Sequence, residues 1–194
     1  MSSSRVTFTD LKRRLDRLSG SLLPPDRAAG DYSEADQDRI HAYILLVHAE
    51  IESFIEKLAI FAADQARRKS SANKCAPVAS RLLLYRAMQS KERIEYPTMD
   101  TISGACSFFE KLVDKNHGIK SINVCHLFMP LGLTHSDLDP VLMANLDTFG
   151  TYRGELAHTS ARLKQGTSPS KEKTMVMNIL RDLAHFDQKV RALL

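Results

Sequence analysis

Residues 33–67 constrain the fold most, because apolar side chains recur there at alternating steps of four and three. This spacing places them on one face of a long helix and is typical of a packing seam. Ser33 provides the N-terminal cap, with Asp36 three positions later. The seam fits packing within one helical bundle, and a seam between two chains is the alternative. Its members are Ile40, Ile44, Val47, Ile51, Phe54, Leu58 and Phe61.

The rest of the chain also has helical spacing, with little alternation of period two and no strand–helix–strand pattern. We therefore predict an all-α fold, an up-and-down helical bundle with a short N-terminal helix. Gly20 ends that first helix, and Asp100 or Thr101 caps a later one. The predicted domains are residues 1–32, an N-terminal helix and Pro-rich linker, and residues 33–194, the helical domain. Helices are expected over residues 9–19, 33–67, 78–88, 100–116, 119–129, 139–161 and 170–194.

Composition excludes several classes of protein. No run of about 18 apolar residues is present, so the sequence predicts no membrane-spanning helix, and the N-terminus lacks an apolar run of secretory type. The 3 cysteines have no tight spacing, which fits a reduced, cytoplasmic protein and disfavours a zinc site. We expect no metal and no cofactor.

Positive charge is concentrated between residues 67 and 93, although the net charge of +4 is mild. The candidate RNA contacts in this stretch are Arg67, Arg68, Lys69 and Lys74, since a basic cluster suits an anionic partner. The alternative is a solvated face whose charges are neutralised by acidic neighbours in space.

Residues 139–161 predict a second long helix with two different faces. Asp139 caps it and Pro140 takes the first helical position. Its buried stripe comprises Leu138, Leu142, Leu146, Phe149, Tyr152 and Leu156. A strip with almost no side chains lies elsewhere on the helix, formed by Gly150, Gly154, Ala157 and Ala161. Because glycine inside a helix costs roughly 1 kcal/mol against alanine, we expect another helix, a second copy of the chain or a substrate's phosphate backbone to approach this strip closely.

Arg153 and His158 border this strip, as Arg, four residues and His near the end of a long helix. Together with the stretch HAYILLVHAEIESFIEKLA at residues 41–59, this motif resembles the HEPN superfamily, and most closely its RiboL-PSP-HEPN group. The resemblance covers residues 34–194 and implies a bundle of HEPN type.

The resemblance also implies a function, that of an endoribonuclease that cleaves RNA by 2′-OH transesterification without a metal. Arg153 would bind the phosphate and His158 would act as base or acid, leaving a 2′,3′-cyclic phosphate. The implied partners are RNA and, in a bacterial toxin or phage-defence setting, an antitoxin or other defence-system protein. The alternative is a non-catalytic HEPN module that binds RNA or a partner protein. An Arg and a His near a helix C-terminus also complement the helix dipole without any functional role.

Four further residues are candidates for supporting roles. His48 and Glu52 lie four positions apart on the first long helix and face each other, either beside the Arg–His pair or as an exposed ion pair. Tyr152 flanks the motif, with core packing as the alternative. Glu155 either orients an Arg or His across an interface or is a solvated surface residue.

The spacing of the motif leaves two possibilities open, and the resemblance implies a dimer. Five steps along a straight helix place Arg153 and His158 about 140° apart, so they converge only across a bend or against a neighbouring helix. In HEPN families that neighbour is typically the second subunit. We therefore expect a homodimer with a composite site and its axis near this helix.

Overall fold

The computed structural model describes residues 7–28, 32–72, 74, 76–90, 98–158 and 168–194. In these residues the chain forms seven α-helices and one short 3-10 turn and no strand, so the prediction of an all-α fold is confirmed. The elements are α1 (Phe8–Leu22), α2 (Glu34–Ser71), α3 (Pro77–Gln89), α4 (Met99–Val113), α5 (Ser121–Phe128), η1 (His135–Asp137), α6 (Pro140–His158) and α7 (Pro169–Ala192). None of the described helices is both long and apolar enough to cross a bilayer.

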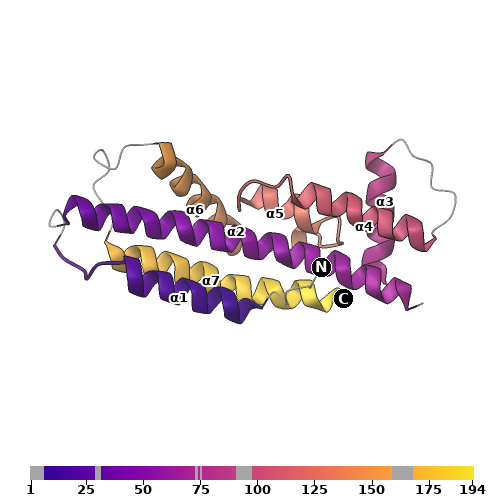
Figure 1. The fold of residues 1–194 in the computed structure, drawn as a ribbon, viewed down its shortest axis with the longest axis horizontal. Coiled ribbons are helices and arrows are strands. Elements are labelled where there is room, and N and C mark those ends of the chain that lie inside the picture. The colour runs from indigo at the N-terminus through magenta and orange to yellow at the C-terminus, as the bar shows by residue number, and fades with distance from the viewer. Residues whose placement is uncertain (1–6, 29–31, 73, 75, 91–97, 159–167) are drawn as a thin grey trace.

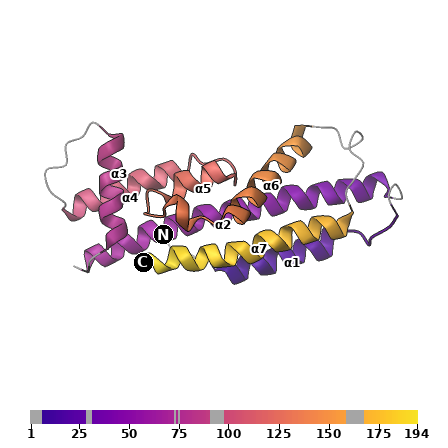
Figure 2. The ribbon, with the colours of Figure 1, turned by 180° about the vertical axis from the view of Figure 1, so that it is seen from behind.

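α2 is the central element of the fold. It spans 38 residues, about 57 Å at the rise of an α-helix, and it packs against each of the other described α-helices. α1 and α7 run alongside it, α6 is inclined to it, and α3 crosses it near one end (Figure 1, Figure 2). The predicted seam is buried within this single chain from Ile40 to Leu58, and Phe61 is half-buried. The seam therefore joins helices of one bundle.

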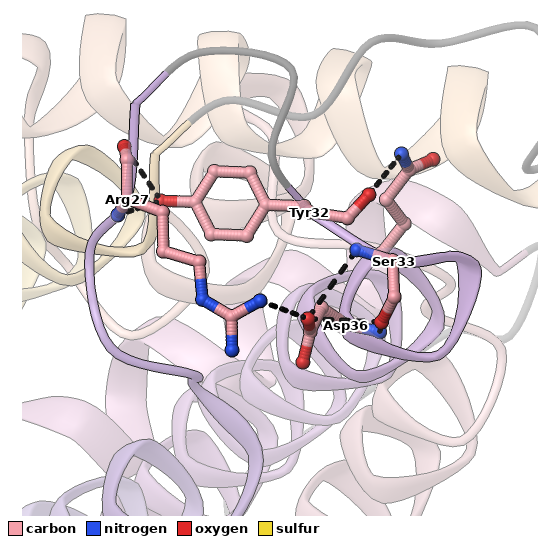
Figure 3. A network of polar contacts seen from close by, with 5 residues as sticks. Arg27, Tyr32, Ser33 and Asp36 are labelled. Atoms are coloured by element: carbon pink, nitrogen blue, oxygen red, sulfur yellow. Dashed lines mark hydrogen bonds and ion pairs between the residues drawn. The ribbon is translucent and has the colours of Figure 1, made fainter.

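A capping box formed by Ser33 and Asp36 begins α2, as predicted. The Asp36 N–H donates to Ser33 Oγ at 3.1 Å, and the Ser33 N–H donates to Asp36 Oδ2 at 3.3 Å. Arg27 adds an ion pair to the same carboxylate at 3.2 Å, and its backbone N–H donates to the Tyr32 hydroxyl at 2.9 Å (Figure 3). The side-chain hydrogen bond from Ser33 holds the pKa of Asp36 below its ordinary value. These contacts tie the segment before α2 to its first turn.

α1 is packed into the bundle against α2 and α7. Arg14 Nε lies 2.8 Å from Glu50 Oε1 of α2, which adds a polar contact to the apolar one. The boundary between residues 1–32 and 33–194 stays a prediction. The buried side chains of α1 are Leu11, Leu15 and Leu18.

Two predicted helix caps were wrong, and the helix expected over residues 100–116 ends at Val113. α1 continues past Gly20 to Leu22, because this glycine does not take the positive φ of a C-terminal cap. Thr98, rather than Asp100 or Thr101, caps α4, because the Thr98 hydroxyl accepts the Thr101 N–H at 3.2 Å. In both cases the periodicity predicted the helix, whereas the residue at which it begins or ends depended on local backbone geometry or on one hydrogen bond.

The start of α6 is formed as predicted. Asp139 Oδ1 accepts the N–H groups of Val141 and Leu142 at 2.7 and 3.2 Å, and Pro140 opens the helix. Tyr152 of the predicted stripe is half-buried. The remaining members of the stripe are buried, namely Leu138, Leu142, Leu146, Phe149 and Leu156. This packing fixes which way the other faces of α6 point.

Candidate functional site

A pocket of about 290 Å³ lies between the middle of α2, the segment before α5, and α6. The sequence singled out four of its lining residues, His48, Glu52, Gly150 and Arg153, which come from α2 and α6. The structure thus brings together side chains that lie about one hundred positions apart in the chain. The other lining residues are His117, Gly118, Ile119, Lys120 and Asn123.

The α2 wall of the pocket carries a buried imidazole. His48 is only 4% exposed, and its Nδ1 lies 3.7 Å from Glu52 Oε2. Within the described residues this nitrogen has no hydrogen-bond partner. Burial lowers the pKa of His48; Glu52 opposes the shift and the positive charge of Arg153 adds to it. The ring is therefore held neutral near physiological pH, and its Nδ1 is buried without a hydrogen bond among the described residues.

The second wall is a loop that side chains from α2 and α5 hold in place. Glu52 Oε1 accepts the Gly118 N–H, and Gly118 has a positive φ of 122° that favours glycine. The Asn116 amide donates to Glu56 Oε1 at 2.9 Å and to the Gly118 carbonyl at 3.1 Å. Asn123 in turn donates to Asn116 Oδ1 at 3.1 Å. The loop that carries His117 and Lys120 is thus ordered before any ligand binds.

Contacts with α6 fix the other end of this loop. The backbone N–H and the hydroxyl of Ser121 both donate to Asp147, each at 2.8 Å. A Cβ placed on Gly150 would lie 3.0 Å from Cγ of Lys120 and 3.5 Å from its Cε. The Lys120 stem therefore lies across α6 where a glycine leaves room for it.

The predicted glycine and alanine strip is divided by this contact. Gly150 is approached by the chain's own Lys120, whereas a Cβ on Gly154 would meet no atom of the described residues within 4 Å. Ala157 is exposed, and Ala161 lies outside the described residues. The part of the strip that remains open to a second protomer therefore begins at Gly154.

The two motif residues lie on the last two turns of α6. Arg153 is exposed and lines the pocket. His158 is the last residue of α6, and its side chain lies outside the described part of the structure. The rise of an α-helix separates their backbones by about 7.5 Å.

Tyr152 and Glu155 lie away from the residues that line the pocket. The Tyr152 hydroxyl donates to Glu172 Oε1 of α7 at 3.0 Å, and Glu172 is buried. Burial raises the pKa of Glu172, and the hydrogen bond from Tyr152 opposes the shift. Tyr152 thus packs between α6 and α7, which was the alternative given for it, and Glu155 is exposed.

The predicted RNA contacts at the end of α2 differ among themselves. Arg67 pairs with Asp64 Oδ1 at 2.9 Å and with Glu110 Oε1 of α4 at 2.5 Å, so its guanidinium joins two helices. Arg68 and Lys74 are exposed, and Lys69 is half-buried. Arg68 is about 24 Å from Glu52 along α2, so this cluster is separate from the pocket. Arg67 is the member of the cluster whose charge is already paired, and the role of all four residues as RNA contacts stays a prediction.

Sequence reasoning missed the residues of the loop wall, above all His117 and Lys120. They fall in a short polar stretch with no period, between two helices. The available signal was Gly118, which has polar residues on both sides and which the spacing alone indicates only as the end of a helix. In the described residues, no group of three or more metal-binding side chains is assembled, here or elsewhere.

An all-α bundle around one long central helix, with Arg153 and His158 at the end of a later helix, defines the class of HEPN-domain proteins. The chain matches the family model described as RiboL-PSP-HEPN over residues 9–190, and it belongs to that family. The match begins within α1, earlier than residue 34. Searches of curated proteins and of solved structures found no match.

Proposed function

We propose that the chain is a metal-independent endoribonuclease that cleaves RNA by transesterification. The observation that carries this proposal is that Arg153 of the motif opens onto the same pocket as the buried His48 and Glu52. A fixed cation beside a neutral imidazole, in a pocket with preformed walls, suits a phosphodiester and its proton transfers. Membership of the family supports an RNA-related module of this kind.

The reaction uses the nucleophile that RNA itself carries. A base removes the proton of the 2′-OH, the 2′-oxygen attacks phosphorus, and the P–O5′ bond breaks as an acid protonates the leaving 5′-oxygen. Arg153 stabilises the charge that develops on the non-bridging oxygens. His158, whose unperturbed pKa lies near neutrality, serves as acid or base. The products are a 2′,3′-cyclic phosphate and a 5′-hydroxyl.

The site is proposed to be completed by a second protomer. Arg153 and His158 diverge by about 140° on α6, so one copy does not direct both at one phosphate along a straight helix. The open face at Gly154 and Ala157 lies between them and permits close approach of another backbone. A cytoplasmic setting, with a role in a toxin or phage-defence system and a cognate antitoxin or defence partner, is part of the proposal through the family resemblance.

The test is cleavage of a mixed RNA substrate by purified protein in EDTA. Arg153→Ala and His158→Ala are compared with matched surface variants, Arg39→Ala and His126→Ala. Cleavage that leaves cyclic-phosphate ends and is lost in the first pair alone would establish the activity. Equal cleavage by all five proteins would contradict it. RNA binding that depends on Arg153, without cleavage, would instead identify the non-catalytic module.

A further inference from the structure

We propose that Lys120 and Arg153 of one protomer bind the same RNA phosphate from two sides of the pocket. Lys120 is thus assigned as a second phosphate ligand, presented by the loop between α4 and α5. The inference rests on the proposed function, because it takes RNA as the ligand. It adds a binding residue that lies outside the Arg–His motif.

The approach of Lys120 to α6 is the main observation. Its Cγ and Cε would lie 3.0 and 3.5 Å from a Cβ at position 150, so the stem crosses the helix at Gly150. Arg153 is three residues further along, and residues three apart are neighbours on a helix surface. The Lys120 ammonium is therefore carried to the same stretch of α6 from which the Arg153 guanidinium projects.

The loop that presents Lys120 is preorganised. Glu52 and Asn116 hold the backbone at Gly118, and Asp147 accepts both donors of Ser121, the residue directly after Lys120. These contacts anchor the loop to α2 on one side and to α6 on the other. A ligand that binds here does not have to order the loop, so more of the contact energy appears as affinity.

The charges in the pocket favour an anion. Neither Lys120 nor Arg153 forms an ion pair within the part of the chain that the structure describes. Among the described lining residues Glu52 is the one acid, and its Oε1 already accepts the Gly118 N–H. Two cations that share a pocket repel each other, and a phosphate between them removes that cost while gaining charge-assisted hydrogen bonds.

A buried polar group points to the same ligand. His48 is 4% exposed, lines the pocket, and has no hydrogen bond at Nδ1 among the described residues. A polar atom that is buried without a partner is costly in a folded protein. A phosphate oxygen or a ribose hydroxyl in the pocket would provide that partner. His117, exposed at the rim, supplies a further donor.

The experiment measures binding apart from cleavage. The probe is a short single-stranded RNA with 2′-O-methyl riboses, which lacks the nucleophile, and binding is followed by fluorescence anisotropy at several salt concentrations. Lys120→Ala is compared with Lys120→Arg and with Lys111→Ala, an exposed lysine of α4 outside the pocket. Thermal unfolding of each variant shows that it is folded.

We expect Lys120→Ala to weaken binding about tenfold and to reduce the salt dependence by about one phosphate contact. Lys120→Arg should restore most of the affinity, and Lys111→Ala should change it less than about twofold. The double variant with Arg153→Ala should lose less than the sum of the two single losses, since both side chains hold one phosphate.

Two negative results are distinguishable. If Arg153→Ala weakens binding but Lys120→Ala behaves like Lys111→Ala, the role of Lys120 is refuted and the proposed function stands. If neither Arg153→Ala nor Lys120→Ala changes binding, the pocket is not the RNA site and both proposals fall. Strictly additive losses would place the two cations on different phosphates and would also overturn the inference.

Discussion

Replacing Gly154 by alanine should have opposite effects on the stability of one protomer and on the association of two protomers. Gly154 lies inside α6, and a Cβ there would meet nothing within 4 Å among the described residues. Alanine restricts the unfolded chain more than glycine does, so Gly154→Ala should raise the free energy of unfolding of a protomer by about 0.5–1 kcal/mol. For a domain of this size the melting temperature should rise by about 1–4 °C.

The same methyl group has the opposite effect on a dimer that uses this face. If two α6 helices approach closely at Gly154, the added carbon overpacks the contact by about 1–3 kcal/mol. The dimer dissociation constant should then rise about tenfold or more, and cleavage should fall at concentrations where the parent protein is dimeric. Sedimentation velocity over a range of protein concentrations, with RNA cleavage measured in parallel, detects both effects.

Gly20→Ala is the matched control, because Gly20 also lies within a helix and a Cβ there also meets nothing within 4 Å. It should stabilise the chain comparably and leave association unchanged. Unfolding is measured at protein concentrations below the dissociation constant of the dimer, since the apparent stability of a dimer depends on protomer concentration. If Gly154→Ala stabilises the protomer and alters neither association nor cleavage, the proposed dimer face is refuted. If it destabilises the monomer, the reasoning from open space is refuted.

Three more predictions concern the two walls of the pocket and the basic end of α2. Glu52→Ala should lower the free energy of unfolding by about 1.5–3 kcal/mol in urea, because Gly118 loses a charged acceptor, and Glu52→Gln should cost less. Arg67→Ala should lower the free energy of unfolding by about 1–2 kcal/mol, which a urea titration measures. It should change RNA affinity less than Arg68→Ala does, which a binding titration measures. The pKa of His48 is lowered from 6.5 by burial, so the unfolded chain takes up its proton first and stability should fall as the pH drops below about 6.5. His48→Asn should make that decline shallower in unfolding curves measured at several pH values.

The sequence was sufficient to predict those parts of the structure that depend on the spacing of nearby residues. The seam of α2, the capping box at Ser33 and Asp36, and the cap at Asp139 each follow from residues within a few turns of one another. These features place His48 and Glu52 on one helix and Arg153 on another. The family resemblance then indicated that the two helices meet, and the pocket is where they do.

The loop that forms the second wall of the pocket could not be predicted from the sequence, because it depends on contacts between residues far apart in the chain. Gly118 and Glu52 are 66 residues apart, and Asn116 and Glu56 are 60 apart. No periodic pattern connects such pairs, and the stretch around Gly118 reads only as the end of a helix. The charge run at residues 67–74 likewise did not reveal the pairing of Arg67, because its partner Glu110 lies 43 residues away on α4. Long-range polar contacts decided both outcomes.

The two proposals assign different neighbours to two stretches of the strip beside Arg153. At about 100° per residue, Gly150, Ala157 and Gly154 all lie on the side of Arg153 that faces His158, at about 60°, 40° and 100°, but Gly150 lies about 4.5 Å before Arg153 along the helix axis and Ala157 about 6 Å after it. Lys120 covers the strip at Gly150 within the protomer, and among the described residues nothing covers it at Gly154. Binding of an uncleavable RNA should therefore depend on Lys120 even in a monomer. Cleavage should depend in addition on Gly154, because the proposed composite site is completed by a second protomer at this stretch. A variant that loses cleavage through Gly154→Ala but keeps its affinity for the uncleavable RNA would show that one copy binds the phosphate and two copies cleave it.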